Sequence, residues 1–424
     1  MIIRKRSILG MVMMALRLSQ TELDAAEQGR SGGGGGRGGR QRQPEPPRNL
    51  YLPTVESQEE LEEYRALIAE ESALTRLTLA DAFLTAYPES ELGYRVLRAR
   101  VETYLGIQNF QTAIPAAEQA MAAELAFYDS KQAMLATQET EDPEAAAESR
   151  ESEEYKDFVM EHADTERFFT RVLMESNAQL GRFEAVVEVG DKFFEAENNL
   201  FEMYEATADT GASEHQQAVE QHRGMQFLYF QNIIGAYQTL DQPDMLIESA
   251  SQALELDPEN LAFLMVLSDT MASRPSEDED VLEDQMDVAE EHAEKALEKV
   301  EQLLASPASM QMAEQQRAGL QTAVYATLGR IRYNLADYDD AGDYYQQALD
   351  ASPRDTASHF FLGLCYAREN KGDEALESLA KAVFLKGPEE PQARSMLEEI
   401  WRNLSKPEGG LPQFIEEQGS DLGS

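Results

Sequence analysis

Apolar residues recur every three or four positions from residue 57 onward, among many Ala, Leu, Glu and Gln residues. This spacing places the apolar side chains on one face of an α-helix. Between residues 322 and 355, two such stripes follow one another, separated by an Asp-rich turn and closed by Pro353. The first stripe is Val324, Leu328, Ile331 and Leu335, and the second is Ala341, Tyr345 and Ala348. The pattern predicts two amphipathic helices joined by a tight turn, which is a helical hairpin.

The hairpin pattern repeats after 34 residues, which is the mark of a repeat architecture. The corresponding positions are Leu328-Gly329 with Leu362-Gly363, Ala341 with Ala375, and Ala348 with Ala382. Small residues at such positions let two helices approach closely, while the larger residues between them fill the gaps. We therefore expect these eight residues to pack the hairpins. The pattern resembles the tetratricopeptide repeat, in which a helix A with Leu-Gly precedes a helix B with spaced alanines, followed by proline.

Residues 322–355 and 356–389 carry this resemblance, with two departures: Tyr333 lies one place late in its helix, and His359 replaces a large aromatic residue. Less regular hairpins are expected at 57–90, 94–127, 166–199, 227–260 and 261–306. One hairpin cannot bury its own apolar face, so neighbouring hairpins must stack. The resemblance implies an all-α protein, a right-handed α-solenoid of stacked hairpins. The segment 392–404, with the single tryptophan Trp401, is expected to cap it.

The remaining segments complete the expected organisation. In chain order they are a basic leader or signal peptide (1–26), a disordered Gly/Arg/Pro-rich linker (27–56), N-terminal hairpins (57–127), an acidic insertion (128–165), central hairpins (166–306), C-terminal repeats with the capping helix (307–404) and a disordered tail (405–424). A second irregular stretch lies at 200–226. Both irregular stretches fit helical extensions or loops, and either a binding face or solvated spacers.

The charge balance excludes several classes of partner. Lys and Arg number 36 against 79 Asp and Glu, a net charge of -43, and the first fifty residues alone carry +5. Because nucleic-acid binding depends on basic residues that displace counterions from phosphate, the acidic body predicts no nucleic-acid partner. It also repels anionic lipid headgroups, and no membrane insertion is expected in the mature chain. Two explanations fit the acidity, steering of basic partners toward the groove and general solvation, and we favour the second because the charge spreads over every repeat.

The usual patterns of catalytic chemistry are missing from the sequence. The glycine-rich stretch at 32–39 lacks the Lys-Ser/Thr of a phosphate-binding loop, and there is no zinc-binding helix or serine nucleophile elbow. His215 and His222 are seven residues apart, too far for one metal ion on a helix. The acidic run from Glu277 to Asp280 lacks the ligand spacing of a calcium loop. A single cysteine, Cys365, is expected to be buried and inert. We expect no enzyme activity, metal or cofactor.

Binding of a protein or peptide is the remaining function. The resemblance implies an inner groove lined by variable positions of helix A, which are Gln231, Gln238, Arg330, Tyr333, Asn334, Phe360, Leu364 and Arg368. Aromatic, guanidinium and amide groups suit an extended peptide or a partner helix. A clamp for a chain-terminal carboxylate is not expected, because Asn232 alone matches that pattern and its lysines are missing. The sequence therefore predicts a non-enzymatic interaction scaffold.

Two alternatives and the cellular location stay open at this point. An enzyme site inside an irregular insertion would require a shifted carboxylate or histidine in a deep pocket. An RNA-associated factor would act through the Gly/Arg-rich tail. Residues 4–17 resemble the basic and apolar regions of a signal peptide, and Phe83 to Glu91 resembles helix B of repeats in bacterial envelope proteins. Together they predict export to a bacterial periplasm or cell envelope, and otherwise a cytoplasmic protein.

Overall fold

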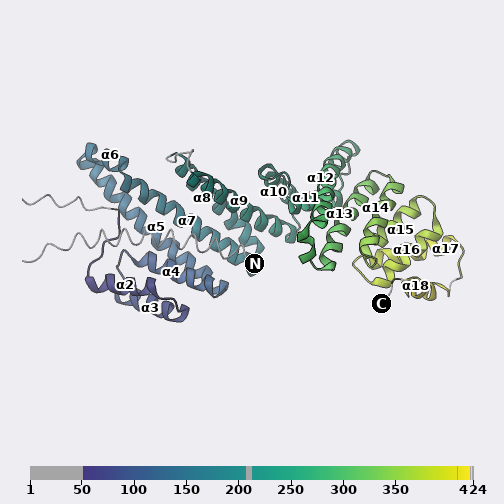
Figure 1. Ribbon diagram of the computed structural model, residues 1–424, viewed down its shortest axis with the longest axis horizontal. Helices are drawn as coiled ribbons and strands as arrows, with labels where there is room; N and C mark the ends of the chain where they lie inside the picture. The colour runs from purple at the N-terminus through teal and green to yellow at the C-terminus, as the bar shows by residue number, and fades with distance from the viewer. Residues whose placement is uncertain (1–50, 207–212, 408, 421, 423–424) are drawn as a thin grey trace, which may run out of the picture. The chain divides into compact units, whose positions relative to one another are not determined.

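The computed structural model describes residues 51–206, 213–407, 409–420 and 422, and these residues form a succession of α-helices (Figure 1). The chain divides into two units at Asn232/Ile233, inside α9. Unit 1 contains α2 (Gln58–Ala69), α3 (Ala73–Ala86), α4 (Gly93–Gly106), α5 (Phe110–Glu141), α6 (Pro143–Glu151), α7 (Glu153–Gln179), α8 (Phe183–Glu205) and the first part of α9 (Ser213–Thr239).

Unit 2 begins within α9 and continues to the C-terminus. It contains α10 (Pro243–Leu256), α11 (Leu261–Ser273), α12 (Glu279–Ala305), the short 3₁₀ helix η1 (Pro307–Gln311), α13 (Glu314–Asn334), α14 (Tyr338–Ala351), α15 (Thr356–Arg368), α16 (Gly372–Leu385), α17 (Glu390–Asn403) and α18 (Leu411–Ser420). The described part of the chain is all-α, and the hairpins of each unit stack in chain order as an α-solenoid, as predicted. The helices of the two predicted repeats, α13 with α14 and α15 with α16, pack as hairpins, and α17 covers α16.

One turn motif recurs between helices A and B of five hairpins. Each turn contains a residue in the left-handed region, with φ between 53° and 68°: Gln108, Gly181, Asp241, Ala336 and Asn370. The amide of the next residue donates to a carbonyl five positions back, as Asp337 N does to Arg332 O at 2.9 Å. This is the Schellman ending of a helix, which satisfies carbonyls that the helix leaves unpaired. The same reversal therefore sets the direction of each B helix.

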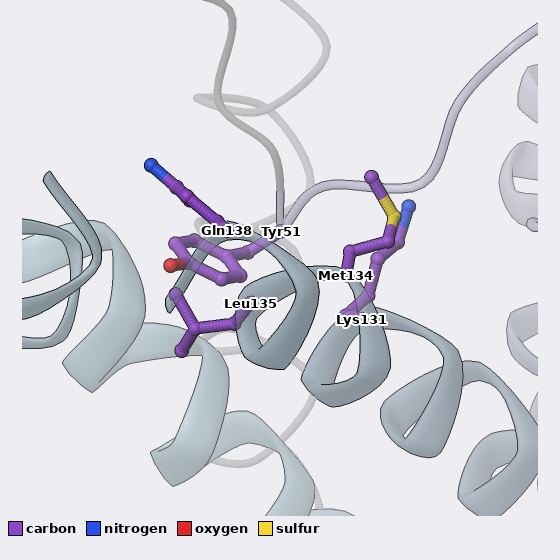
Figure 2. A pocket seen from close by; sticks show the side chains of 5 residues that line it. All are labelled: Tyr51, Lys131, Met134, Leu135 and Gln138. Carbon is purple, nitrogen blue, oxygen red and sulfur yellow. The ribbon is translucent and has the colours of Figure 1, made fainter. Parts of the chain in front are cut away.

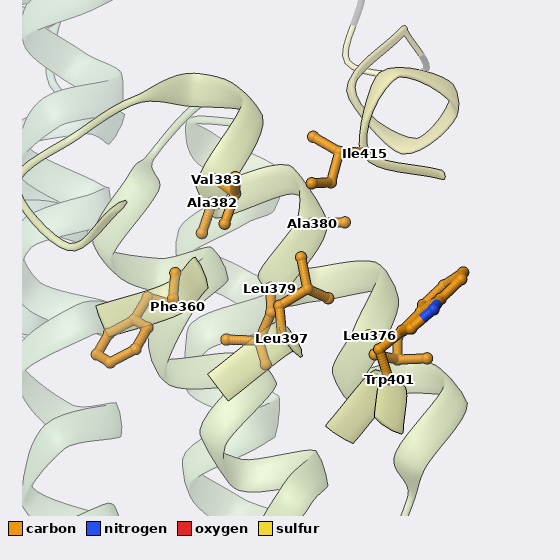
Figure 3. Packing of buried hydrophobic residues seen from close by; sticks show 10 residues of the cluster. Phe360, Leu376, Leu379, Ala380, Ala382, Val383, Leu397, Trp401 and Ile415 are labelled. Carbon is orange, nitrogen blue, oxygen red and sulfur yellow. The ribbon is translucent and has the colours of Figure 1, made fainter. Parts of the chain in front are cut away.

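Close approach of helices packs unit 2. All eight predicted packing residues are buried. A Cβ atom on Gly363 would lie 2.7 Å from Cγ of Leu379, and one on Gly329 would lie 3.0 Å from the Tyr345 ring. The apolar core continues into α17 and α18, where Leu379, Leu397, Trp401 and Ile415 belong to one cluster (Figure 3). Glycine is thus required where an A helix meets the large side chain of its B helix.

Long helices follow one another in unit 1, and unit 2 also contains long helices, α12 with 27 residues and α13 with 21. Helix α5 has 32 residues, α7 has 27 and α8 has 23, against 13 or 14 for α14, α15 and α16. The predicted insertion 128–165 consists of the end of α5, the short α6 and the start of α7. The stretch 200–226 lengthens α8 and α9, with residues 207–212 outside the described part. Of the two alternatives for these insertions, helical extension is the one observed.

Two predictions of disorder are wrong in part. Residues 51–56, assigned to the linker, are held by packing: Tyr51 is buried against Tyr155 and Phe158, and the amide of Thr54 donates to Glu91 at 2.6 Å. Residues 411–420, assigned to the tail, form α18, which packs on α16 and buries Ile415. The apolar positions of both segments find neighbours far away in the sequence. The leader and residues 27–50 lie outside the described residues.

Candidate functional site

The A helices of unit 2 form a continuous surface, called here the A-helix face and made of α11, α13 and α15. Helix α13 contacts both α11 and α15, whereas the B helices α12, α14 and α16 lie farther from one another. The side on which neighbouring hairpins touch is the inner side of a curved stack. Side chains on the A-helix face therefore gather from successive hairpins, and a bound segment would touch several of them at once.

Charge is sorted between the two sets of helices in unit 2. Helices α11, α13 and α15 carry four basic and two acidic side chains. Helices α10, α12, α14 and α16 carry twenty acidic and three basic side chains. The acidity of this unit thus resides on its B helices, while the A helices are close to neutral. A partner on the A-helix face meets much less negative charge than one on the B helices.

Four side chains of α13 and α15 form a ladder of planar groups on this face: Arg330, Phe361, Tyr333 and Arg368. The Arg330 guanidinium lies over the Phe361 ring, 5.3 Å from its centroid. The Tyr333 ring meets Phe361 edge to face, with centroids 6.0 Å apart. A hydrogen bond from Arg368 to Tyr333 raises the pKa of Arg368, which is exposed. The ladder joins two guanidinium groups through two aromatic rings.

Polar contacts tie this ladder to α11. Arg330 Nη1 lies 3.0 Å from Asp269 Oδ1 and also contacts the Ser273 hydroxyl. The side-chain amide of Asn334 donates to the Ala272 carbonyl at 2.8 Å. These bonds hold α13 against α11 and orient the guanidinium over the Phe361 ring. Two of the predicted groove residues, Arg330 and Asn334, are therefore partly engaged within the protein.

The structure places the other predicted groove residues in different surroundings. Phe360 is buried in the core with α16 and α17, so its assignment as a groove residue is wrong. Leu364 is half-buried against the same core. Gln231 and Gln238 are both exposed on α9, two turns apart. Asn232 donates to the Leu228 carbonyl of its own helix.

Phe361 is the ladder residue that sequence reasoning missed. It is adjacent to Phe360, and the sequence alone did not decide which of the two faces the core. The spacing along α15 gives no signal, because Phe360, four residues before Leu364 and eight before Arg368, fits the same face as Phe361. Cys365, one turn after Phe361, is buried as expected, and burial raises the pKa of its thiol to about 12.

Two contacts with the same arrangement join long helices of unit 1, and we call them clasps. Each consists of a histidine, a glutamate and an aromatic residue. In the first, Nδ1 of His162 donates to Glu124 at 2.9 Å, and the imidazole stacks on Tyr128 with centroids 3.7 Å apart. In the second, Nδ1 of His222 donates to Glu197 at 2.9 Å, and the imidazole stacks on Phe201 at 4.0 Å.

Each clasp has a buried glutamate four residues before an aromatic residue on one helix, and a histidine on the antiparallel helix. Arg167 also contacts Glu197, at 3.4 Å. Of the two histidines singled out from the sequence, His222 is thus the partner of a buried carboxylate, whereas His215 stacks on Tyr204. Among the described residues, no group of three or more His, Cys, Asp or Glu side chains could hold a metal ion.

A small cavity of about 60 Å³ lies beside α5, where Tyr51 packs (Figure 2). Its lining includes Lys131, Met134, Leu135 and Gln138. This volume admits only a few water molecules. The Lys131 ammonium lies 2.8 Å from Glu91, the carboxylate that also accepts from Thr54. The first described residues are thereby fastened to α5.

Comparison with known families agrees with this architecture. Residues 327–392 match the model of the tetratricopeptide repeat family. This range runs from the middle of α13 to the start of α17 and includes the ladder. The matched part of the chain thus consists of tetratricopeptide repeats, as the sequence predicts for this region. The chain matches no curated protein. In the described ranges, no helix combines the length and apolar character needed to cross a membrane.

Several solved structures are similar to this chain at low identity. A crystal structure of MamA is 18% identical, with 45% of this chain and 92% of that chain covered and a TM-score of 0.30. TTC0263, a thermophilic tetratricopeptide-repeat protein of Thermus thermophilus, is 16% identical, with 54% and 98% covered and a TM-score of 0.33. The C-terminal part of a repeat-containing protein from Cytophaga hutchinsonii is 10% identical, with 73% and 95% covered and a TM-score of 0.35.

Proposed function

We propose that the chain is a non-enzymatic scaffold that binds a segment of a protein partner along the A-helix face of unit 2. The ladder of Arg330, Phe361, Tyr333 and Arg368 carries this proposal, because arginine and tyrosine are the residues that most often supply binding energy at protein interfaces. Their positions are already set by contacts within the protein. Binding to a preorganised surface costs little ordering entropy.

The charge distribution supports the same face. Arg368 is exposed, and it forms no ion pair with a carboxylate of the described part of the chain. Its guanidinium is free to bind a carboxylate or a backbone carbonyl of a partner. Tyr333 and Phe361 offer apolar area beside it. The partner is expected to bring an apolar or aromatic side chain together with a hydrogen-bond acceptor.

Site-specific photo-crosslinking in the native cells tests the proposal. A photoreactive amino acid replaces Ala323, an exposed residue of α13 two turns before Arg330, and in a separate variant it replaces Gln252, an exposed residue of the B helix α10. We expect one protein to be captured from position 323 and not from position 252. An additional Tyr333→Ala substitution should reduce that capture.

Two results would contradict this function. Capture of the same proteins from both positions would mean that the A-helix face has no special role. Capture from position 323 that is unchanged by Tyr333→Ala would exclude the ladder from the binding site. Circular dichroism of each variant checks that the helices remain folded.

We also infer that residues 1–26 direct export of the chain. The support is the order of basic and apolar residues in the leader, from Arg4 to Arg17. N-terminal sequencing of the mature protein from its own cells tests this inference. An intact Met1, or a start at residue 2, in the cytoplasmic fraction would overturn it.

A further inference from the structure

A cavity of about 600 Å³ lies between the B helices α14 and α16, with α15 as its floor. We call it the B-helix cleft, and its argued lining is Leu349, Asp350, His359, Leu362, Glu374 and Glu377. It involves the same hairpins as the ladder but other side chains. Its volume is enough for one or two large side chains of a partner, and its floor is apolar at Leu349 and Leu362.

A buried histidine in the lining has an unused acceptor. His359 is 5% exposed, and its Nε2 lies 3.0 Å from the Pro353 carbonyl. Since a carbonyl only accepts, Nε2 carries the hydrogen and Nδ1 of the neutral ring carries a lone pair. Nδ1 is buried and has no hydrogen-bond partner among the described residues. Burial lowers the pKa of His359, so the ring stays neutral and keeps that lone pair at neutral pH.

The remaining polar groups of the cleft are mainly carboxylates. Asp350 of α14 lies across from Glu374 and Glu377 of α16, and Lys381 is the one basic lining residue against these three acids. Asp350 accepts a hydrogen bond from Gln346 at 3.1 Å. Glu374 and Glu377 form no ion pair with any cation in the described part of the chain. The cleft thus offers several acceptors above an apolar floor.

We propose that the B-helix cleft binds an arginine side chain presented by a segment of a protein partner. A guanidinium group has five N–H donors and no acceptor, which complements a lining of carboxylates and an imidazole lone pair. The methylene stem of arginine covers the apolar floor while its charged end reaches the carboxylates. The planar group also stacks on aromatic rings such as Tyr366, which borders the cleft.

The acidity of the B helices favours the same partner. Twenty acidic side chains on α10, α12, α14 and α16 attract a basic segment and raise its rate of encounter. The unpaired carboxylates of the cleft then bind an arginine in preference to other basic side chains of the segment. This site is independent of the A-helix face, so a single pair of hairpins would hold two different segments at once.

Titration calorimetry on the full chain tests the cleft with a defined probe. The probe is an acetylated and amidated helical peptide with two arginines and two leucines on one face, and a matched peptide carries citrulline, which keeps the shape of arginine without its charge. We expect saturable binding of the arginine peptide at one site and at least tenfold weaker binding of the citrulline peptide.

Matched variants locate the site. Glu374→Gln with Glu377→Gln should weaken binding of the arginine peptide about tenfold. Glu398→Gln with Glu399→Gln, exposed on α17 outside the cleft, makes the same change in net charge and should alter affinity less than twofold. Lys381→Gln should strengthen binding, because it removes the competing cation. A gain of affinity is a result that structural damage would not produce.

Three results would overturn the proposal. Equal weakening by the two double variants would show that the peptide responds only to the general field of the protein. Equal binding of the arginine and citrulline peptides would exclude recognition of the guanidinium. Weaker binding by Lys381→Gln would contradict the assigned role of the acidic lining. The crosslinking experiment from position 323 is independent of all three results, so the proposals for the B-helix cleft and for the A-helix face can fail separately.

Discussion

The two units hold similar hairpins together by different means. In unit 2 the short helices α14, α15 and α16 meet through Gly363 and a set of buried alanines, and a cluster of apolar residues continues to Ile415. In unit 1 the long helices α5, α7, α8 and α9 extend past the shared core and are joined by the two clasps of His162 and His222. Unit 2 relies on close packing, and unit 1 adds buried polar pairs.

The difference follows from what each helix has to pack against. A helix of about 14 residues lies between neighbours along its whole length and buries a full apolar face. Near the ends of the long helices polar contacts add to the apolar ones, and Glu197 of α8 contacts both Arg167 of α7 and His222 of α9. Stacked rings with a hydrogen-bonded carboxylate supply contact area and fix the register between two such helices. A clasp of this kind forms in one alignment of the two helices, whereas a contact of apolar side chains alone would tolerate others.

The largest expected effect is on the close packing of unit 2. Gly363→Leu places a side chain against Leu379, where even a Cβ atom would lie 2.7 Å from Cγ, and we expect a loss of about 3 kcal/mol. The fluorescence of Trp401, the only tryptophan, reports unfolding of this end, while circular dichroism reports the whole chain. The fluorescence midpoint in urea should fall first.

Gly319→Leu is the matched control in the neighbouring helix α13. A Cβ at Gly319 has open space around it, and the substitution improves helix propensity by roughly 0.5–1 kcal/mol. A common transition for both probes in Gly363→Leu, at the wild-type midpoint, would contradict the assignment of this glycine to close packing.

The second prediction concerns the clasp of His222. Glu197→Gln keeps the shape of the side chain but removes the charge that Arg167 and His222 share, and Glu197 is 3% exposed. We expect a loss of about 2 kcal/mol, less than for a fully buried pair because Arg167 and His222 keep some contact with water. Hydrogen exchange should speed up in α8 and the first part of α9.

Glu195→Gln, an exposed neighbour on α8, is the control and should change stability by less than about 0.5 kcal/mol. Faster exchange across unit 2 in Glu197→Gln, with α8 unchanged, would refute a local role for the clasp.

The third prediction tests whether α18 belongs to the close packing of unit 2. A Cβ at Gly419 would lie 2.1 Å from the Phe384 ring, so Gly419→Ala should detach α18 at a cost of about 1–2 kcal/mol. Trp401 contacts Phe414 of α18 with centroids 5.3 Å apart, and its emission should shift to the red. Gly409→Ala, with nothing near its Cβ, should leave the emission unchanged.

The smallest expected change in stability concerns the residue in the left-handed region of a turn, compared between one turn of each unit. Ala336 of unit 2 has φ of 60°, and Gly181 of unit 1 has φ of 68° in the same turn motif. A side chain in this region costs roughly 1 kcal/mol, so Ala336→Gly should stabilise the protein by about 0.5–1 kcal/mol and Gly181→Ala should destabilise it by a similar amount. Urea unfolding of both variants measures the pair. Changes of the same sign would rule out backbone strain as the cause.

Local patterns predicted the architecture because repeats carry the same information many times. Leu328-Gly329 and Leu362-Gly363 lie 34 residues apart, and close approach of two helices leaves little choice at those positions. The position of Phe360 was harder, because Phe360 and Phe361 are adjacent and both are large and apolar. Only the packing of α16 and α17 on α15 decides that Phe360 is buried and that Phe361 meets Arg330.

The charge is a second example. The sequence shows acidic residues in every repeat, and we interpreted them as a general solvation device. Folding separates them within each hairpin of unit 2, with the excess on B helices and a nearly neutral A-helix face. A count along the chain does not reveal this separation, because helices A and B alternate and the average over a repeat hides the difference.

The sequence by itself determined the all-α repeat architecture and the small and large residues where helix A packs on helix B. These depend on periodicity and on side-chain size, which act between residues close in the chain. The tertiary structure decided the ladder, the two clasps, the B-helix cleft and the order of residues 51–56 and 411–420. Each of these brings together residues from separate helices, and their alignment depends on the packing of whole hairpins.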